Sequence, residues 1–450
     1  MEQFLNKLNN YWFKSIEIKY LSLTRIVIVG FTLVILLYEN FVLYDNAKTG
    51  GNTNLIFQKW LTTIEPSEYN SMWVLKFLLA PLGWNVRPEI LFIDLVWASA
   101  LIFGIFSLIG LYTRLSLFIF AAANTFLVAH AYSYNEYHHP ESIVVIALWI
   151  LAFGYNKNSW SIDNLKNRIF SSVDHMTFKP VEKNKSDEYA RWPLLLMQWV
   201  FVFVYFSAGL EKLLKSGFDW LNGYTLAYSF AIDGFLHGHT AGVWAAGFPV
   251  VLQFFSVFSI LFETTFIFAL LFPRIAWIYV AFAISFHAGS YILQATPFIF
   301  YYLPVLIVFI EPIHQKFKKE KPVSNRNKKW TIVYDGLCPL CIRSIVTLNY
   351  IDIKDRLSFL DFNEQWNKVE NITAKLDPET ASHYMHVVDP DGNIYRGFFA
   401  FKELSHRLVL LSPLIPILHL PFLNKIGPWV YDKIASSRKR ICRVDNCIIY

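Results

Sequence analysis

The feature that most constrains this chain is a series of apolar runs long enough, or nearly long enough, to cross a bilayer. A helix needs about 20 mostly apolar residues to span the hydrocarbon layer. Eight runs meet or approach this length: residues 21–38, 91–111, 115–134, 142–155, 193–213, 250–272, 275–294 and 297–311, of which the fourth is short. Because 55% of all residues are hydrophobic, the pattern predicts a mainly α-helical, polytopic membrane bundle of about eight spans.

The basic residues lie in alternate connections between these runs. They precede the first run, occupy short turns at Arg114 and Arg274, crowd residues 157–185 and follow the last run, whereas the 131–141 turn has none. The positive-inside rule places the basic segments in the cytoplasm. We therefore expect a multi-pass protein of the cell inner membrane, surrounded by lipid, with both termini cytoplasmic. The basic residues do not form an aromatic-interleaved surface, which argues against nucleic-acid binding.

The apolar pattern ends near residue 312, which predicts a membrane domain over 1–312, a basic linker over 313–329 and a second domain over 330–450. WTIVYDG is typical of a buried strand and turn, and CIRSIVTLNYIDI has helical apolar spacing. This order predicts a C-terminal α/β, thioredoxin-like domain.

Later segments extend that prediction. YMHVVDPDGNIYRG indicates a hairpin, and residues 400–411 and 426–436 indicate helices. Between these helices, LSPLIPILHLPFL is apolar enough to touch lipid, but its prolines argue against a ninth span.

Cys338 and Cys341 form a Cys-Pro-Leu-Cys motif at the predicted strand-to-helix junction. The amides of a helix N-terminus favour a thiolate, so we expect a lowered pKa for Cys338. Cys338 would attack a disulfide and Cys341 would resolve the mixed disulfide. The partner would be a peptide or protein thiol or disulfide.

Two other readings of the cysteines remain open. Cys442 and Cys447 form a second pair, and the four thiols together could hold zinc. The wide separation of the pairs and the strand-turn-helix context disfavour this site, so we expect no bound metal. A purely structural disulfide is disfavoured by the reducing compartment that the topology predicts.

The segment from Tyr334 to Cys341, together with Gly397, Ala400 and residues 429–435, resembles the DCC family of thiol-disulfide oxidoreductases over about 330–440. The resemblance implies that Asp335 is the motif acid, a proton acceptor near the thiols. One departure from thioredoxin chemistry is that no Pro precedes the predicted strand at 384–388, where a cis-Pro usually lines the substrate groove.

Lys212 is an ionisable residue within an apolar stretch, WVFVYFSAGLEKLLKSGFDWLNGYTL, and a charge held near lipid is costly. One reading is a functional pocket. The other is a lysine near a helix end whose stem lies in lipid and whose ammonium reaches the headgroups, with Glu211 and Lys215 as a surface pair.

VYFSAGLEKL, DWLNGYTL, NSWSID, ETTFIFALLFPR and SFH resemble the vitamin K-dependent γ-glutamyl carboxylases and the wider HTTM family over about 20–312. The resemblance implies that Lys212 is the base that deprotonates vitamin K hydroquinone, a role that an apolar site supports by disfavouring the ammonium form. Glu211 stands where the carboxylases carry a basic residue, and it favours the charged lysine. His138 or His139, and His287, match family positions, and together with Glu211 they are the substrate-binding candidates.

These observations predict a membrane redox protein, with a menaquinone or vitamin K hydroquinone pocket near Lys212 and a fused dithiol domain. Its activity would be that of a thiol-disulfide oxidoreductase, a vitamin K-dependent carboxylase or epoxidase, or both. The alternative is a non-catalytic membrane scaffold or peptide-maturation accessory protein whose only chemistry is the dithiol.

Overall fold

The computed structural model describes residues 1–49, 70–80, 88, 90–133, 140–154, 160–180, 186–236, 240–294, 296–317, 329–373 and 375–437. The chain divides into two compact units. The membrane unit comprises Met1–Ser161 and Ser186–Lys318, and the thioredoxin-like unit comprises Ile162–Lys185 and Lys319–Tyr450.

Six helical segments in the described part of the membrane unit are long and apolar enough to cross a membrane. They are Lys19–Leu37 in α2 (Lys19–Thr49), Leu91–Ile109 in α5 (Ile90–Ile109), α6 (Thr113–Tyr132), Glu188–Asn222 around α9 (Arg191–Ser216), Pro273–Gln294 around α14 (Ala276–Gln294) and Phe298–Phe317. They confirm the mainly α-helical membrane bundle.

The two remaining expected spans depart from straight helices. The fourth is the short apolar helix α7 (Ser142–Phe153), and the sixth is a pair, α11 (Thr240–Ala246) and α12 (Pro249–Thr265), bent by 100°. Pro249 begins α12, and it lacks the N–H that would continue the preceding helix.

Shorter elements make up the rest of the described part of the unit. They are α1 (Glu2–Phe13), α4 (Trp73–Leu79), η3 (Glu188–Ala190), η4 (Gly217–Asn222), α10 (Tyr224–Leu236), α13 (Phe268–Leu271), η5 (Pro273–Ile275), α15 (Phe298–Val305), η6 (Leu306–Phe309), α16 (Ile310–Phe317) and the antiparallel pair β1 (Ile16–Glu17) and β2 (Ser186–Asp187). Since α16 continues to Phe317, the linker predicted to start at 313 was placed too early; residues 318–328 lie outside the described residues.

Trp160 of the NSWSID motif has a structural role in the membrane unit. The Trp160 N–H donates to Ser22 Oγ at 2.9 Å, and the buried Arg25 side chain donates to the Trp160 carbonyl oxygen. These bonds attach the segment after α7 to α2.

The thioredoxin-like unit contains a four-stranded sheet of order β4-β3-β5-β6. β3 (Trp330–Tyr334) is parallel to β4 (Leu357–Asp361) and antiparallel to β5 (His386–Val388), which pairs with β6 (Ile394–Arg396). The crossover from β3 to β4 carries α17 (Pro339–Ile351). This β-α-β unit followed by a β-hairpin and a helix confirms the predicted thioredoxin-like topology.

The hairpin and the tail helices also follow the prediction. Val388 pairs with Ile394, and Asp389 Oδ1 accepts hydrogen bonds from the N–H groups of Asp391 and Asn393 within the turn. The helices of this unit after β4 are α18 (Trp366–Ile372), α19 (Pro378–His383), α20 (Gly397–Arg407), η8 (Val409–Leu414), α21 (Ile415–Leu418) and α22 (Leu423–Ala435).

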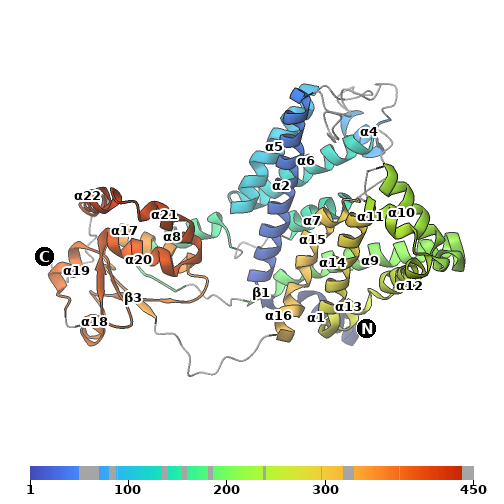
Figure 1. Cartoon of the computed structure of the whole chain (residues 1–450). Coiled ribbons are helices and arrows are strands. Elements are labelled where there is room, and N and C mark those ends of the chain that lie inside the picture. The colour runs from blue at the N-terminus through green and yellow to red at the C-terminus, as the bar shows by residue number, and fades with distance from the viewer. Residues whose placement is uncertain are drawn as a thin grey trace. The chain divides into compact units, whose positions relative to one another are not determined.

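One helix of this unit comes from a distant part of the sequence. α8 (Ile162–Asp174) packs beside α17 (Figure 1). Phe178, which follows α8, places its ring 6.0 Å from Tyr334 and 5.1 Å from Phe359 between centroids. The division therefore differs from the predicted one, because residues 162–185 of the expected membrane domain belong to the second unit.

Candidate redox and membrane sites

Cys338 caps the N-terminus of α17. It has an extended backbone, Pro339 follows at the first helical position, and the Cys341 N–H donates to Cys338 Sγ at 3.3 Å. Proline suits this position because the first helical amides have no intrahelical acceptor. The sulfur of Cys338 therefore lies at the positive end of the helix dipole, as the sequence predicts.

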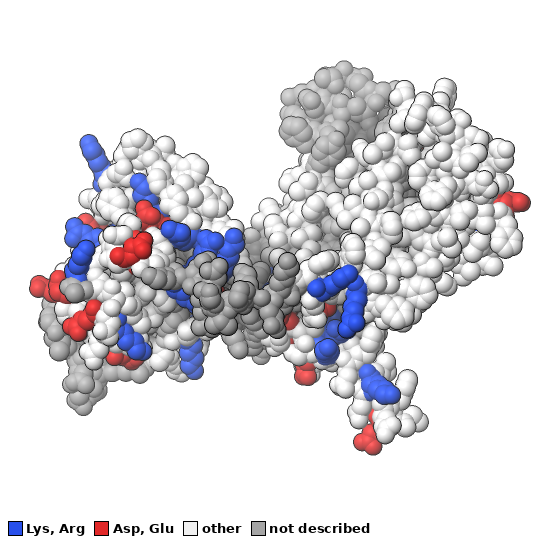
Figure 2. All heavy atoms as spheres, turned by 60° about the horizontal axis from the view of Figure 1, so that its bottom comes forward, with Lys and Arg blue, Asp and Glu red and all other residues white. Residues whose placement is uncertain are grey.

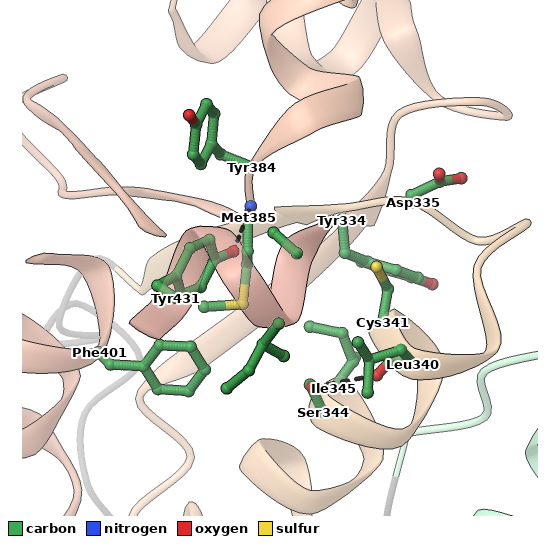
Figure 3. A pocket seen from close by; sticks show the side chains of 12 residues that line it. Tyr334, Asp335, Leu340, Cys341, Ser344, Ile345, Tyr384, Met385, Phe401 and Tyr431 are labelled. Atoms are coloured by element: carbon green, nitrogen blue, oxygen red, sulfur yellow. Dashed lines mark hydrogen bonds between the residues drawn. The ribbon is translucent and has the colours of Figure 1, made fainter. Parts of the chain in front are cut away.

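The two cysteines differ in access. Cys338 is 0% exposed and Cys341 is 9% exposed. Cys341 lines a cavity, and Figure 3 shows its side chain among the cavity residues. The predicted attack by Cys338 therefore requires that this thiol first become accessible.

Asp335 is buried and shapes the turn before the cysteines. Its Oδ1 accepts hydrogen bonds from the Leu337 N–H at 3.0 Å and from Asn363 Nδ2 at 2.8 Å. Asp361 Oδ1 accepts from the Gly336 N–H at 3.1 Å, and a Cβ at Gly336 would collide with this carboxylate. Figure 3 shows the Asp335 carboxylate directed away from Cys341. The sequence reasoning missed Asn363 and Asp361, which lie far along the chain.

The cavity beside Cys341 has a volume of about 140 Å³ and mostly apolar and aromatic walls. α17 provides one wall, Met385 and Phe401 face it, and Tyr384 also lines the cavity. The Met385 N–H donates to the Tyr431 hydroxyl at 3.0 Å, so α22 is fixed to the start of β5. Tyr384 and Met385 thus stand where the sequence lacks the expected proline.

Gly397 explains why its motif position is a glycine. Its φ of +56° lies in the left-handed region, and an added Cβ would come within 3.1 Å of the Tyr431 ring. The motif residues Gly397 and Tyr431 therefore meet at the cavity wall.

Tyr334 also lines this cavity. Burial raises its pKa well above the usual range, and the charges of Asp361 and Glu364 add to the shift. The phenol is therefore neutral at physiological pH and can donate a hydrogen bond.

In the membrane unit, Lys212 forms an ion pair across two helices. Its Nζ lies 2.5 Å from Oε1 and 2.6 Å from Oε2 of Glu263 in α12, and the Glu263 side chain is 4% exposed. Gly209 allows this approach, because a Cβ there would come within 2.9 Å of the Glu263 Cβ. Glu263 belongs to the ETTFIFALLFPR motif, but sequence reasoning did not pair it with Lys212, although it is the only charged residue in the run 250–272.

Trp220 completes the surroundings of Lys212. Lys212 Nζ lies 5.3 Å from the centroid of its ring, a cation–π distance. Within the described part of the chain, the buried Trp220 Nε1 has no hydrogen-bond partner. Since a buried donor without a partner is costly, it marks a position suited to a ligand acceptor.

His287 is buried, and its Nε2 lies 2.5 Å from the Tyr205 hydroxyl. Tyr205 interacts electrostatically with Glu263, and its ring stacks on Phe266 at 4.6 Å. His287 therefore belongs to a polar group that extends toward the Lys212–Glu263 pair.

The other predicted site residues lie elsewhere. Glu211 forms a surface ion pair with Lys215, and both side chains are largely exposed. His138 and His139 lie outside the described residues, as do Cys442 and Cys447. Among the residues that the structure describes, no group of three or more His, Cys, Asp or Glu could hold a metal ion.

The fold and these sites define a class: a multi-pass membrane protein with a thioredoxin-like domain that carries a CxxC motif. The HTTM domain family matches residues 13–313, and the chain belongs to this family. Residues 332–444 match the DCC1-like thiol-disulfide oxidoreductase family. These matches confirm the resemblances to the HTTM and DCC families, whereas the likeness to the γ-glutamyl carboxylases stays a prediction.

One relative is a protein of Arabidopsis thaliana named "Uncharacterized protein At5g50100, chloroplastic". It is 28% identical over 132 residues, which are 29% of this chain and 61% of that protein. This chain thus covers less than two thirds of that relative. No solved structure matches the chain.

Proposed function

We propose that this membrane redox protein is an enzyme that exchanges thiols and disulfides through Cys338 and Cys341. The observation that carries the proposal is the position of Cys338 Sγ at the N-terminus of α17, within 3.3 Å of the Cys341 N–H. The Cys338 thiolate attacks a substrate disulfide and releases one substrate thiolate. Cys341 then displaces the second, so the substrate gains two electrons and two protons and a Cys338–Cys341 disulfide forms.

The substrate of this reaction is a peptide or protein thiol or disulfide. The cavity of about 140 Å³ has room for a small apolar side chain next to Cys341, the resolving cysteine. Because the Met385 N–H already donates to the Tyr431 hydroxyl, it would not be free to donate to the substrate backbone.

Cysteine substitutions in the full-length protein test the reaction. Cys338→Ser and Cys341→Ser should each abolish reduction of a disulfide peptide, and Cys341→Ser should accumulate the mixed disulfide on Cys338. Cys442→Ser removes a cysteine outside the motif and is the matched control. Full activity of both motif variants would refute the proposal. Stoichiometric zinc, lost in all three variants, would instead favour the four-cysteine metal site.

The membrane unit supports a second proposal, a pocket at Lys212 for menaquinone or vitamin K hydroquinone. A quinone has two oxygens that accept hydrogen bonds, and Lys212 Nζ and the Trp220 Nε1 are donors beside each other. Such a group supplies a two-electron, two-proton couple when bound. Lys212 can act as a base only after it releases its proton, and the Glu263 carboxylate is within hydrogen-bond distance to accept it.

Binding of menaquinone to the purified full-length protein tests this pocket. Lys212→Ala and Trp220→Phe should each weaken binding, whereas Lys215→Ala, which removes an exposed lysine of the same helix, should not. The rival hypothesis of a non-catalytic scaffold or peptide-maturation accessory protein predicts no menaquinone binding and no hydroquinone oxidation, with the dithiol chemistry intact.

We also propose that the protein lies in the cell inner membrane with both termini in the cytoplasm. Glu379 is exposed in the thioredoxin-like unit, so a Glu379→Cys variant that lacks the native cysteines can report sidedness. A membrane-impermeant thiol reagent should label it only after cells are opened. Labelling of intact cells would show that the thioredoxin-like unit lies outside the cell and would contradict the proposed orientation.

A further inference from the structure

A second cavity, of about 510 Å³, lies in the membrane unit and is separate from the Lys212 pair. Its walls come from the end of α1 and the residues after it, the start of α9, the α13–η5 segment and α16. Cavities of this size hold small ligands.

The charge of the wall is strongly unbalanced. Four basic residues line it, Lys14, Arg191, Arg274 and Lys316, against one acid, Glu311, which gives the wall a net charge of +3. Glu311 interacts electrostatically with Arg191 and Lys14. The basic excess therefore remains after this acid is neutralised.

Two of the cations are held in place by the protein. Arg191 Nε donates to the Tyr11 carbonyl oxygen at 2.9 Å, which joins α9 to α1. Lys316 Nζ lies 4.5 Å from the centroid of the Trp277 ring. Positioned cations of this kind favour an anion with several oxygens.

Most of the remaining wall is apolar, with Gln198 and Gln315 as polar members. Leu194, Leu195, Leu270 and Leu271 line the same cavity. A small hydrated anion would leave these surfaces in contact with water, whereas a ligand with an acyl chain would cover them.

Figure 2 shows where this wall lies on the unit. Blue side chains gather at the end that carries α1 and α16, and most of the rest of the visible membrane unit is white. Three of the cavity cations, Lys14, Arg274 and Lys316, come from connections that the positive-inside rule assigns to one side of the membrane. Basic pockets between spans on that side bind anionic head groups.

We propose that this cavity binds an anionic amphiphile: a phosphate group among the four cations and an apolar chain along the leucines. An anionic phospholipid is the ligand with both parts. A soluble phosphate shares only the first part.

Lipid binding to the full-length protein in neutral detergent tests the proposal by native mass spectrometry. Phosphatidylglycerol should bind at least about tenfold more tightly than phosphatidylcholine with the same chains. The double variant Arg274→Gln/Lys316→Gln removes two exposed rim charges and should lose this preference. Lys7→Gln removes an exposed charge of α1 outside the cavity and should retain it.

A second double variant, Lys14→Gln/Arg274→Gln, should lose the same preference. Equal binding of the two lipids to the wild-type protein would overturn the proposal, as would an unchanged preference in both double variants. Displacement of phosphatidylglycerol by inorganic phosphate at equal concentration would support the anion site but overturn the assignment to a lipid. Menaquinone binding is measured separately, so the outcome is independent of the Lys212 proposal.

Discussion

At the scale of single residues, the ion-pair partner of Lys212 is Glu263 and not Glu211, its neighbour in the sequence. A charge within an apolar bundle is tolerated when it is paired. Glu263 supplies the counter-charge from α12, whereas Glu211 faces Lys215 at the surface. Two adjacent residues of one helix therefore have opposite surroundings.

Removing only one partner of the Lys212–Glu263 pair should lower the free energy of unfolding far more than replacing both partners. Glu263→Ala leaves a largely buried ammonium and should lower the free energy of unfolding by about 3–5 kcal/mol. The double variant Lys212→Met/Glu263→Leu should recover most of this loss. Denaturant unfolding of the detergent-solubilised protein measures both.

The exposed pair is the matched control for this experiment. Glu211→Ala should change the free energy of unfolding by no more than about 1 kcal/mol. If Glu263→Ala behaves like Glu211→Ala, the buried ion pair does not form in the membrane unit.

Tyr334 gives the thioredoxin-like unit a pH dependence. Its pKa in the folded state is raised above the ordinary value of 10, so the unfolded state loses its proton first as pH rises. The stability due to the neutral phenol is fully present below about pH 10 and is lost above it. Between pH 8 and pH 11, the free energy of unfolding should decline less steeply for Tyr334→Phe than for the wild-type protein. Equal slopes would contradict the raised pKa.

How well the sequence predicts a site depends on how far apart the residues of that site lie along the chain. Cys338, Pro339 and Cys341 lie within one turn, so their arrangement follows from local chemistry. Lys212 and Glu263 are separated by 51 positions, and only the packing of α9 on α12, through Gly209, brings them together. Asn363 reaches Asp335 by the same kind of distant contact, which no local pattern encodes.

At the scale of elements, α22 is the part of the redox domain that its sequence explains least. Its side chains at Tyr431, Ile434 and Ala435 form one wall of the cavity beside Cys341. The strand-turn-helix at β3–α17 and the β5–β6 hairpin could be predicted because turn residues and apolar spacing specify them. The position of α22 could not, since it depends on contacts with distant residues, among them the hydrogen bond of the Tyr431 hydroxyl and the close packing of Gly427 against Phe398.

Tyr431→Phe should loosen this wall. The Met385 N–H loses its acceptor, at a cost of about 0.5–1.5 kcal/mol, and its hydrogen exchange should accelerate. Tyr384→Phe is the control, because Tyr384 also lines the cavity but its hydroxyl makes no hydrogen bond to the described residues. Equal exchange in the two variants would exclude the Tyr431 contact.

At the scale of the whole molecule, the thioredoxin-like unit is assembled from two separated segments. Apolar periodicity predicted the membrane spans and the C-terminal domain, but residues 162–180 gave only a basic loop pattern. Their place follows from the packing of α8 on α17 and from the contacts of Phe178 with Tyr334 and Phe359, and no local pattern in a basic loop signals such distant contacts.

Phe178→Ala should therefore destabilise the thioredoxin-like unit although the residue precedes four membrane-spanning elements in the chain. We expect a loss of about 1–3 kcal/mol, since Phe178 is only partly buried. Phe170→Ala is the control, because that ring is 68% exposed on α8. Unfolding monitored by protease cleavage within 329–437 measures both variants, and equal stability would contradict the packing of Phe178.

The position of α8 in the chain also fixes an order of events during biosynthesis. α8 is made before α9 to α16, but its partner α17 is made after them. At about 5–20 residues per second, the ribosome needs roughly ten to thirty seconds to pass from one to the other. During that interval the later spans are synthesised, and α8 lacks the α17 surface on which it packs. The redox domain can therefore be completed only after the membrane unit has been fully synthesised.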